Sequence, residues 1–77
     1  MQNDKNKLSI NLNPLLSRYV DNVRKERGMS IIEISGVLGI HRNSYNRILK
    51  GPDGFTEVQL RRAAAEFGFD IEAKIKL

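Results

Sequence analysis

The side chains best suited to specific recognition in this sequence lie between residues 42 and 50. Arg42 and Asn43 are neighbours, and Arg47 follows Asn43 by about one helical turn, with Ser44 and Asn46 at the edges of the same group. An arginine guanidinium can form two parallel hydrogen bonds to guanine, and an asparagine amide can do the same with adenine. The pattern predicts base contacts in the major groove of double-stranded DNA from Arg42, Asn43 and Arg47, and further ones from Ser44 and Asn46.

The residue types give little support to catalysis or metal binding. The chain has no cysteine, a single histidine and no pairing of a nucleophile with a general base. We therefore expect no enzymatic activity, no catalytic residue, no cofactor and no metal site. The histidine, His41, directly precedes a predicted helix, where it could cap the helix, contact a DNA phosphate or do neither.

The positive charge is concentrated in the middle of the chain. Thirteen Lys and Arg against nine Asp and Glu give a net charge of +4. Residues 18–50 alone carry +4, whereas residues 1–17 carry +1 and residues 51–77 carry −1, as expected of a protein whose central segment binds a polyanion. Because no apolar run has the length of a signal peptide or a membrane span, we expect a cytoplasmic protein with no membrane partner.

Four helices are predicted from their start and stop signals. Asn followed by Pro suits the N-cap and first position of a helix, and Gly suits the position just after a helix. A Ser or Thr followed three residues later by Glu or Gln forms a capping box at a helix start. The signals are Asn13-Pro14 and Gly28 for the first helix, Ser30, Glu33 and Gly39 for the second, and Thr56, Gln59 and Gly68 for the fourth. The third helix is predicted from about Arg42 to Lys50, with Tyr45, Ile48 and Leu49 as its apolar positions.

Short strands are predicted near both ends of the sequence. Apolar and polar residues alternate over residues 8–12 and 70–77, which is typical of strands with one buried face. A two-stranded ribbon is marginally stable alone, and unpaired strand edges favour pairing with another chain. We therefore expect a small sheet shared between the subunits of a homodimer. The predicted dimerisation residues are Leu8, Ile10, Ile71, Ala73, Ile75 and Leu77.

The two middle helices meet the requirements of a helix-turn-helix at about residues 31–50. A small residue must lie on the first helix where the second crosses it, and the turn needs a residue that adopts positive φ freely, which is glycine. Ser35 and Gly39 meet these requirements. Apolar residues on both sides hold the angle between the helices: Ile34, Leu38, Ile40, Tyr45 and Ile48.

The segment from Gly28 to Gly51, with its continuation through Phe69, resembles the Cro and repressor family of lambdoid phages, the Xre type of helix-turn-helix. The resemblance covers about residues 14–69 and implies a mainly α, four-helix lambda-repressor-like domain within a single domain of residues 1–77. It also implies a sequence-specific transcriptional regulator of phage, prophage or plasmid type, acting as a homodimeric repressor on a palindromic operator. Lys50 lies where the family contacts backbone phosphate. The antitoxin of a toxin–antitoxin pair, which binds a toxin partner and represses its own operon, remains an alternative.

Three positions depart from the family pattern. Ile31 replaces a Gln whose side chain binds a phosphate, so that only the helix N-terminus at Ile31 remains to bind one. Ser35 replaces the usual Ala. Leu49 occupies the position of a Glu that pairs with an Arg of the first helix in some repressors, so we expect Arg24 to be free to contact a phosphate.

Overall fold

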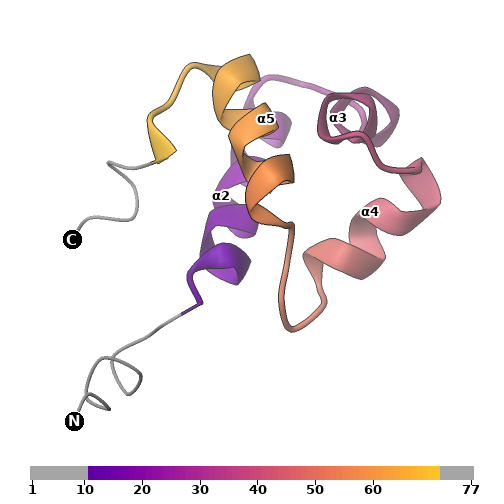
Figure 1. Cartoon of the computed structure of the whole chain (residues 1–77). Coiled ribbons are helices and arrows are strands. Elements are labelled where there is room, and N and C mark those ends of the chain that lie inside the picture. Colours follow the sequence, from indigo (N-terminus) through magenta and orange to yellow (C-terminus); the bar gives the residue numbers. More distant parts are fainter. Residues whose placement is uncertain (1–10, 72–77) are drawn as a thin grey trace, which may run out of the picture.

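Residues 11–71, which the structure (a computed structural model) describes, form four α-helices and no strand. The helices are α2 (Asn13–Glu26), α3 (Ile31–Leu38), α4 (Arg42–Leu49) and α5 (Glu57–Phe67), as labelled in Figure 1. The prediction of a mainly α fold with four helices is confirmed for this part of the chain. The third predicted helix ends at Leu49, with Lys50 as its C-cap.

The start of α2 differs from the prediction by one residue. Leu12 is at the N-cap position, and Asn13 is the first helical residue. The N-cap residue Leu12 makes no side-chain cap, and the Asn11 side-chain oxygen accepts a hydrogen bond from the Asn13 amide at 3.0 Å. Asn side chains often bond two residues ahead in this way.

Both predicted capping boxes are confirmed. The Ser30 hydroxyl accepts from the Glu33 amide at 3.0 Å, and the Glu33 carboxylate accepts from the Ser30 amide at 2.8 Å. Thr56 and Gln59 make the equivalent bonds at 3.2 and 2.9 Å. Each box satisfies amides that have no partner within the helix, which fixes the first residues of α3 and α5. α5 ends where predicted, at Gly68, which has a φ of 79°.

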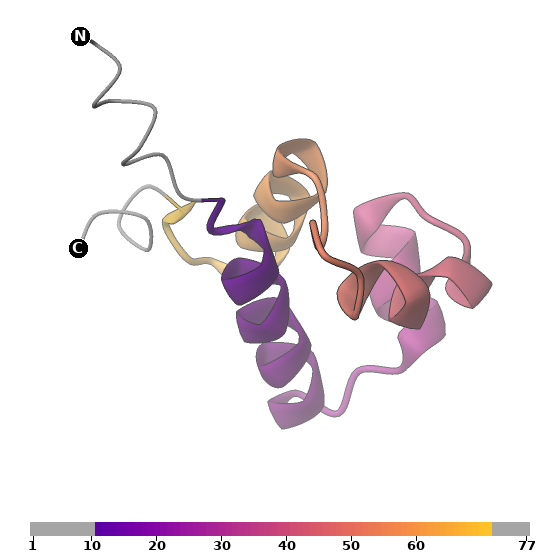
Figure 2. The same ribbon diagram turned by 90° about the horizontal axis from the view of Figure 1, so that it is seen from below.

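The core lies between α2, α3 and α5, and α4 contributes one fully buried residue, Tyr45. The inner face of α5 is formed by four buried residues, Leu60, Ala63, Ala64 and Phe67. α4 lies across the domain from the two ends of the described chain (Figures 1 and 2). The buried apolar residues are Leu16, Val20, Ile34, Leu38, Tyr45, Phe55, Leu60, Ala63, Ala64, Phe67 and Ile71.

A buried serine joins α2 to the segment before α5. The Ser17 hydroxyl donates to the Asn13 carbonyl at 2.6 Å and accepts from the Phe55 amide at 2.8 Å. Gly54 allows this approach, because a Cβ at residue 54 would lie 2.5 Å from the Ser17 oxygen and 3.0 Å from the Asn13 carbonyl. Ser17 therefore fixes the entry of the chain into α5.

The predicted terminal strands lie mostly outside the described residues, which exclude Leu8, Ile10, Ala73, Ile75 and Leu77. The structure describes four residues of the predicted strands, residues 11, 12, 70 and 71, and none of them is in a strand. The Leu12 carbonyl accepts from the Leu16 amide at 2.9 Å, as in a helix. Ile71 is helical and 5% exposed in the core. Burial in the core of its own chain accounts for the apolar character of Ile71, so a place in a dimer interface is not needed to explain it.

Ser35→Ala is expected to raise the free energy of unfolding by about 1 kcal/mol, since a buried hydroxyl without a partner is costly. Ser35 is 2% exposed, and its hydroxyl has no hydrogen-bond partner among the described residues. Ser17→Ala is the matched control and should instead lower this free energy by about 1–3 kcal/mol, because it leaves the Phe55 amide without its partner. Urea unfolding followed by circular dichroism measures the stability of both variants. A Ser35→Ala variant less stable than the parent would contradict the conclusion that the Ser35 hydroxyl is buried without a partner.

Candidate nucleic-acid interface

The turn between α3 and α4 is made by Gly39, as predicted. Its φ is 76°, in the left-handed region that favours glycine. The amides of Gly39 and Ile40 both donate to the Ser35 carbonyl, at 2.8 and 3.0 Å. Arg62 of α5 donates to the Leu38 carbonyl at 3.2 Å and so also satisfies this end of α3. The turn therefore fixes the direction in which α4 begins.

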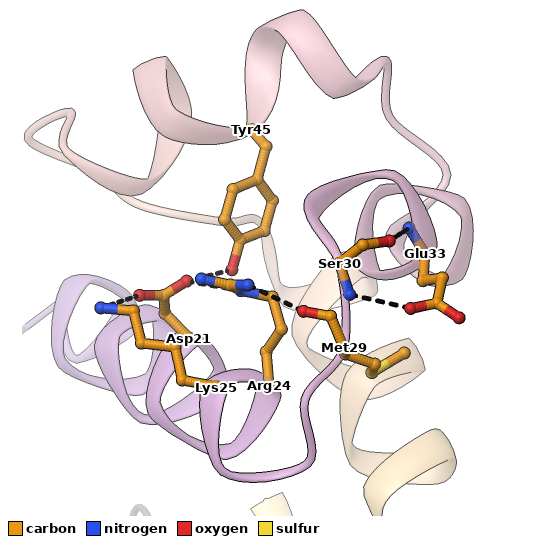
Figure 3. Close-up of polar contacts among 7 residues, drawn as sticks. All are labelled: Asp21, Arg24, Lys25, Met29, Ser30, Glu33 and Tyr45. Atoms are coloured by element: carbon orange, nitrogen blue, oxygen red, sulfur yellow. Dashed lines mark hydrogen bonds and ion pairs between the residues drawn. The ribbon is translucent and has the colours of Figure 1, made fainter.

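Tyr45 attaches α4 to the rest of the domain. Its ring lies 5.3 Å from the Phe55 ring, centre to centre, and its hydroxyl donates to the Asp21 carboxylate at 2.7 Å. Figure 3 shows the side chain pointing from α4 toward α2. Ile48 and Leu49 pack against the core while partly buried. One side of α4 is thus held by the domain, and the other faces outward.

The outward side of α4 carries the predicted base-contacting residues. Four of the five predicted base-contacting residues are exposed, as is Lys50, whereas Ser44 is half-buried. The Ser44 hydroxyl accepts a hydrogen bond from the Arg47 guanidinium at 3.1 Å, so Ser44 orients Arg47 in the protein without DNA. The exposed residues are Arg42, Asn43, Asn46, Arg47 and Lys50. This surface offers donors and positive charge and, within residues 42–50, no carboxylate.

His41 caps α4, which is one of the three roles that the sequence left open. Its Nδ1 accepts a hydrogen bond from the Asn43 amide at 3.0 Å. The side chain is also exposed, so its contact with a phosphate stays a prediction. By fixing the first turn of α4, His41 positions Arg42 and Asn43.

Arg24 is not free, contrary to the expectation drawn from Leu49. Its Nε donates to the Asp21 carboxylate at 3.0 Å, and its Nη1 donates to the Met29 carbonyl at 2.8 Å (Figure 3). The side chain is 13% exposed. Asp21, one turn earlier on α2, takes the place of the missing Glu as the partner of Arg24. A phosphate contact by Arg24 would have to compete with these bonds.

The N-terminus of α3 carries a carboxylate close to the predicted phosphate site. Glu33 bonds to the Ser30 amide immediately before Ile31, the first residue of the helix. Hydrogen bonds from the backbone and the hydroxyl of Ser30 hold the pKa of Glu33 below its usual range, so the carboxylate is charged at neutral pH. A phosphate at Ile31 would approach this negative charge, which weakens the prediction that the α3 N-terminus binds DNA.

Asp21 is the site residue that the sequence interpretation missed. Burial alone would raise the pKa of its carboxyl, but hydrogen bonds from Tyr45, Arg24 and Lys25 outweigh burial and lower it. Burial and the Asp21 carboxylate raise the pKa of Tyr45, whose hydroxyl is therefore protonated and donates the bond. A signal was present, since Asp21 precedes Arg24 by three residues and Lys25 by four, the spacings of helical ion pairs.

Residues 11–71 contain no group of three or more His, Cys, Asp or Glu side chains placed to hold a metal ion. None of the helices within this range is long and apolar enough to cross a membrane.

Comparison with known families supports the interpretation of α3 and α4. A model of the helix-turn-helix family matches residues 21–73, more than two-thirds of the chain. The matched range begins within α2 and includes α3, α4 and α5. Comparison with curated proteins and with solved structures gave no match.

Proposed function

Because the chain belongs to the helix-turn-helix family, of the Xre and Cro type, we propose that it is a cytoplasmic repressor that binds a palindromic DNA operator as a homodimer. In this proposal α4 is the recognition helix and lies in the major groove. The protein acts by binding and not by catalysis.

The observation that carries the proposal is the exposed side of α4. The domain holds α4 through Tyr45 and leaves Arg42, Asn43 and Arg47 exposed. Their hydrogen-bonding groups complement those that guanine and adenine present in the major groove. We propose that Lys50, at the C-terminal end of the same helix, binds backbone phosphate. The Arg47 and Lys50 charges would also attract DNA of any sequence, so binding should weaken steeply with salt.

Selection of bound sequences from a pool of random duplex DNA tests this function. A specific regulator should enrich one family of sites, and a homodimer should enrich inverted repeats. Recognition helices related by a two-fold axis and about 34 Å apart would match half-sites one helical turn apart. Enrichment of no sequence above the starting pool would contradict the proposed function.

The proposed homodimer is formed by the terminal segments, as the alternating pattern of residues 8–10 and 72–77 suggests. These segments continue the chain at the two ends of its described part, and both ends lie across the domain from α4 (Figures 1 and 2). Pairing of the segments would therefore leave the outward side of α4 available for DNA.

Removal of residues 72–77 is expected to convert the dimer into a monomer that binds a single half-site weakly. This truncation retains Ile71, which is buried in the core, so the helical domain should still fold. Sedimentation at high micromolar concentration measures the change, with circular dichroism as the control for folding. A full-length chain that sediments as a monomer, or a truncated chain that binds the full operator as well as the parent, would contradict the proposed dimer.

A further inference from the structure

Tyr45 is the one fully buried residue of α4. It is 0% exposed, so its hydroxyl has no access to water and depends on the Asp21 carboxylate for its hydrogen bond. Packing against Phe55 limits where the ring can lie, and the bond to Asp21 further limits its depth and direction. The placement of α4 on the domain therefore depends on a side chain with both a packing contact and a directed polar contact.

The Asp21 side chain joins α4 to two cationic residues of its own helix, α2. Its Oδ1 accepts from Tyr45 of α4 at 2.7 Å and from Arg24 of α2 at 3.0 Å, and its Oδ2 pairs with Lys25 at 3.3 Å. Arg24 continues the connection by donating to the Met29 carbonyl, just before α3. Figure 3 shows these side chains as one continuous set of contacts from α4 through α2 to the start of α3.

We propose that Asp21, Arg24 and Tyr45 position the recognition helix, so that the hydroxyl of Tyr45 contributes to discrimination between DNA sequences without touching DNA. This inference rests on the proposed function, because it assigns these residues to the accuracy of base recognition. Directed bonds to a charged carboxylate are stronger than neutral ones and constrain geometry more closely. Base contacts need such constraint, since Arg42 and Arg47 must meet donor and acceptor positions of fixed spacing. Phosphate contacts tolerate small rotations of α4 far better.

Tyr45→Phe in the full chain tests the inference. The substitution keeps the ring that packs on Phe55 and removes only the hydroxyl. Asp21 keeps two cationic partners, Arg24 and Lys25, so the protein should remain folded. Affinity for the selected operator is expected to fall about tenfold, whereas affinity for a scrambled duplex of equal length should stay within about twofold.

Three further variants separate positioning from stability. Tyr19→Phe removes a hydroxyl from a half-buried tyrosine of α2 whose ring packs edge-on against Phe69, and it should leave the operator-to-scrambled ratio unchanged. Asp21→Asn retains a side-chain oxygen that can accept from Tyr45, and Asp21→Ala does not. The asparagine variant should therefore keep more of the ratio than the alanine variant when both are measured well below their unfolding transitions.

The results distinguish failure of this inference from failure of the proposed function. A parent protein that binds operator and scrambled duplexes equally would contradict the proposed function. A parent that discriminates, together with a folded Tyr45→Phe variant that discriminates equally well, would overturn the positioning role. Equal loss of affinity for both duplexes in Tyr45→Phe would also overturn it, because a general loss of stability affects every sequence alike.

Discussion

Gly39→Val is expected to lower the free energy of unfolding by about 2–4 kcal/mol and to abolish DNA binding. Gly39 has a φ of 76°, and a β-branched residue is strongly disfavoured there. A Cβ at residue 39 would also overlap the Arg62 guanidinium, which would have to leave the Leu38 carbonyl. A domain of this size has a stability of roughly 4–12 kcal/mol, so the expected loss is a large fraction of the total.

The matched control for this substitution is Gly36→Val, three residues earlier in α3. Gly36 is exposed, lies within a regular helix, and has nothing within 4 Å of the position that a Cβ would take. Valine there should change the unfolding midpoint in urea little, since its helix propensity is somewhat better than that of glycine. A Gly39→Val variant as stable as Gly36→Val would mean that the turn does not require a left-handed residue.

Arg42→Ala and Arg47→Ala are expected to cost about 1–3 kcal/mol each at the operator, a loss of roughly 5- to 150-fold in affinity. Each should also relax the sequence preference at the base pair that the arginine contacts. The reason is geometric, since bidentate donors match guanine and no other base. Fluorescence anisotropy with the operator and its single-base variants measures the affinity and the preference together.

Two controls show whether these losses reflect base recognition. Lys50→Ala should weaken binding to all duplexes alike and reduce the salt dependence, because a phosphate contact carries no sequence information. Arg61→Ala removes an exposed arginine of α5 that is paired with Glu57 at 2.8 Å, and it should leave binding unchanged. Unaltered operator affinity in both Arg42→Ala and Arg47→Ala would contradict the assignment of α4 as the recognition helix.

The helical part of the fold could be predicted from local signals in the sequence. The Ser30–Glu33 and Thr56–Gln59 pairs form the expected capping boxes, and Gly39 has the expected positive φ. These signals are reliable because a capping bond spans three residues and depends on little beyond them. The outward side of α4 could be predicted for a similar reason, since helical periodicity alone separates Tyr45 from its exposed neighbours.

The contacts that hold α4 could not be predicted in the same way. Arg24 was expected to be free because the sequence lacks the family's Glu at residue 49, yet Asp21 is its partner. The helical spacing indicated that this pair was possible, but not that Tyr45 of another helix would bond to the same carboxylate 24 residues away. Such a bond depends on the packing of two helices, which no local signal encodes. The predicted strand at residues 70–77 was wrong at Ile71 for the same reason, since its apolar side chain packs in the core of its own chain.

Methylation interference on the selected operator tests the central claim, that α4 reads bases in the major groove. Dimethyl sulfate modifies guanine at N7, which faces the major groove, and adenine at N3, which faces the minor groove. We expect guanine N7 methylation to block binding at the positions read by Arg42 and Arg47, and adenine N3 methylation to have no effect within the same half-site. Interference confined to adenine N3, or absent from every guanine of the operator, would contradict this account.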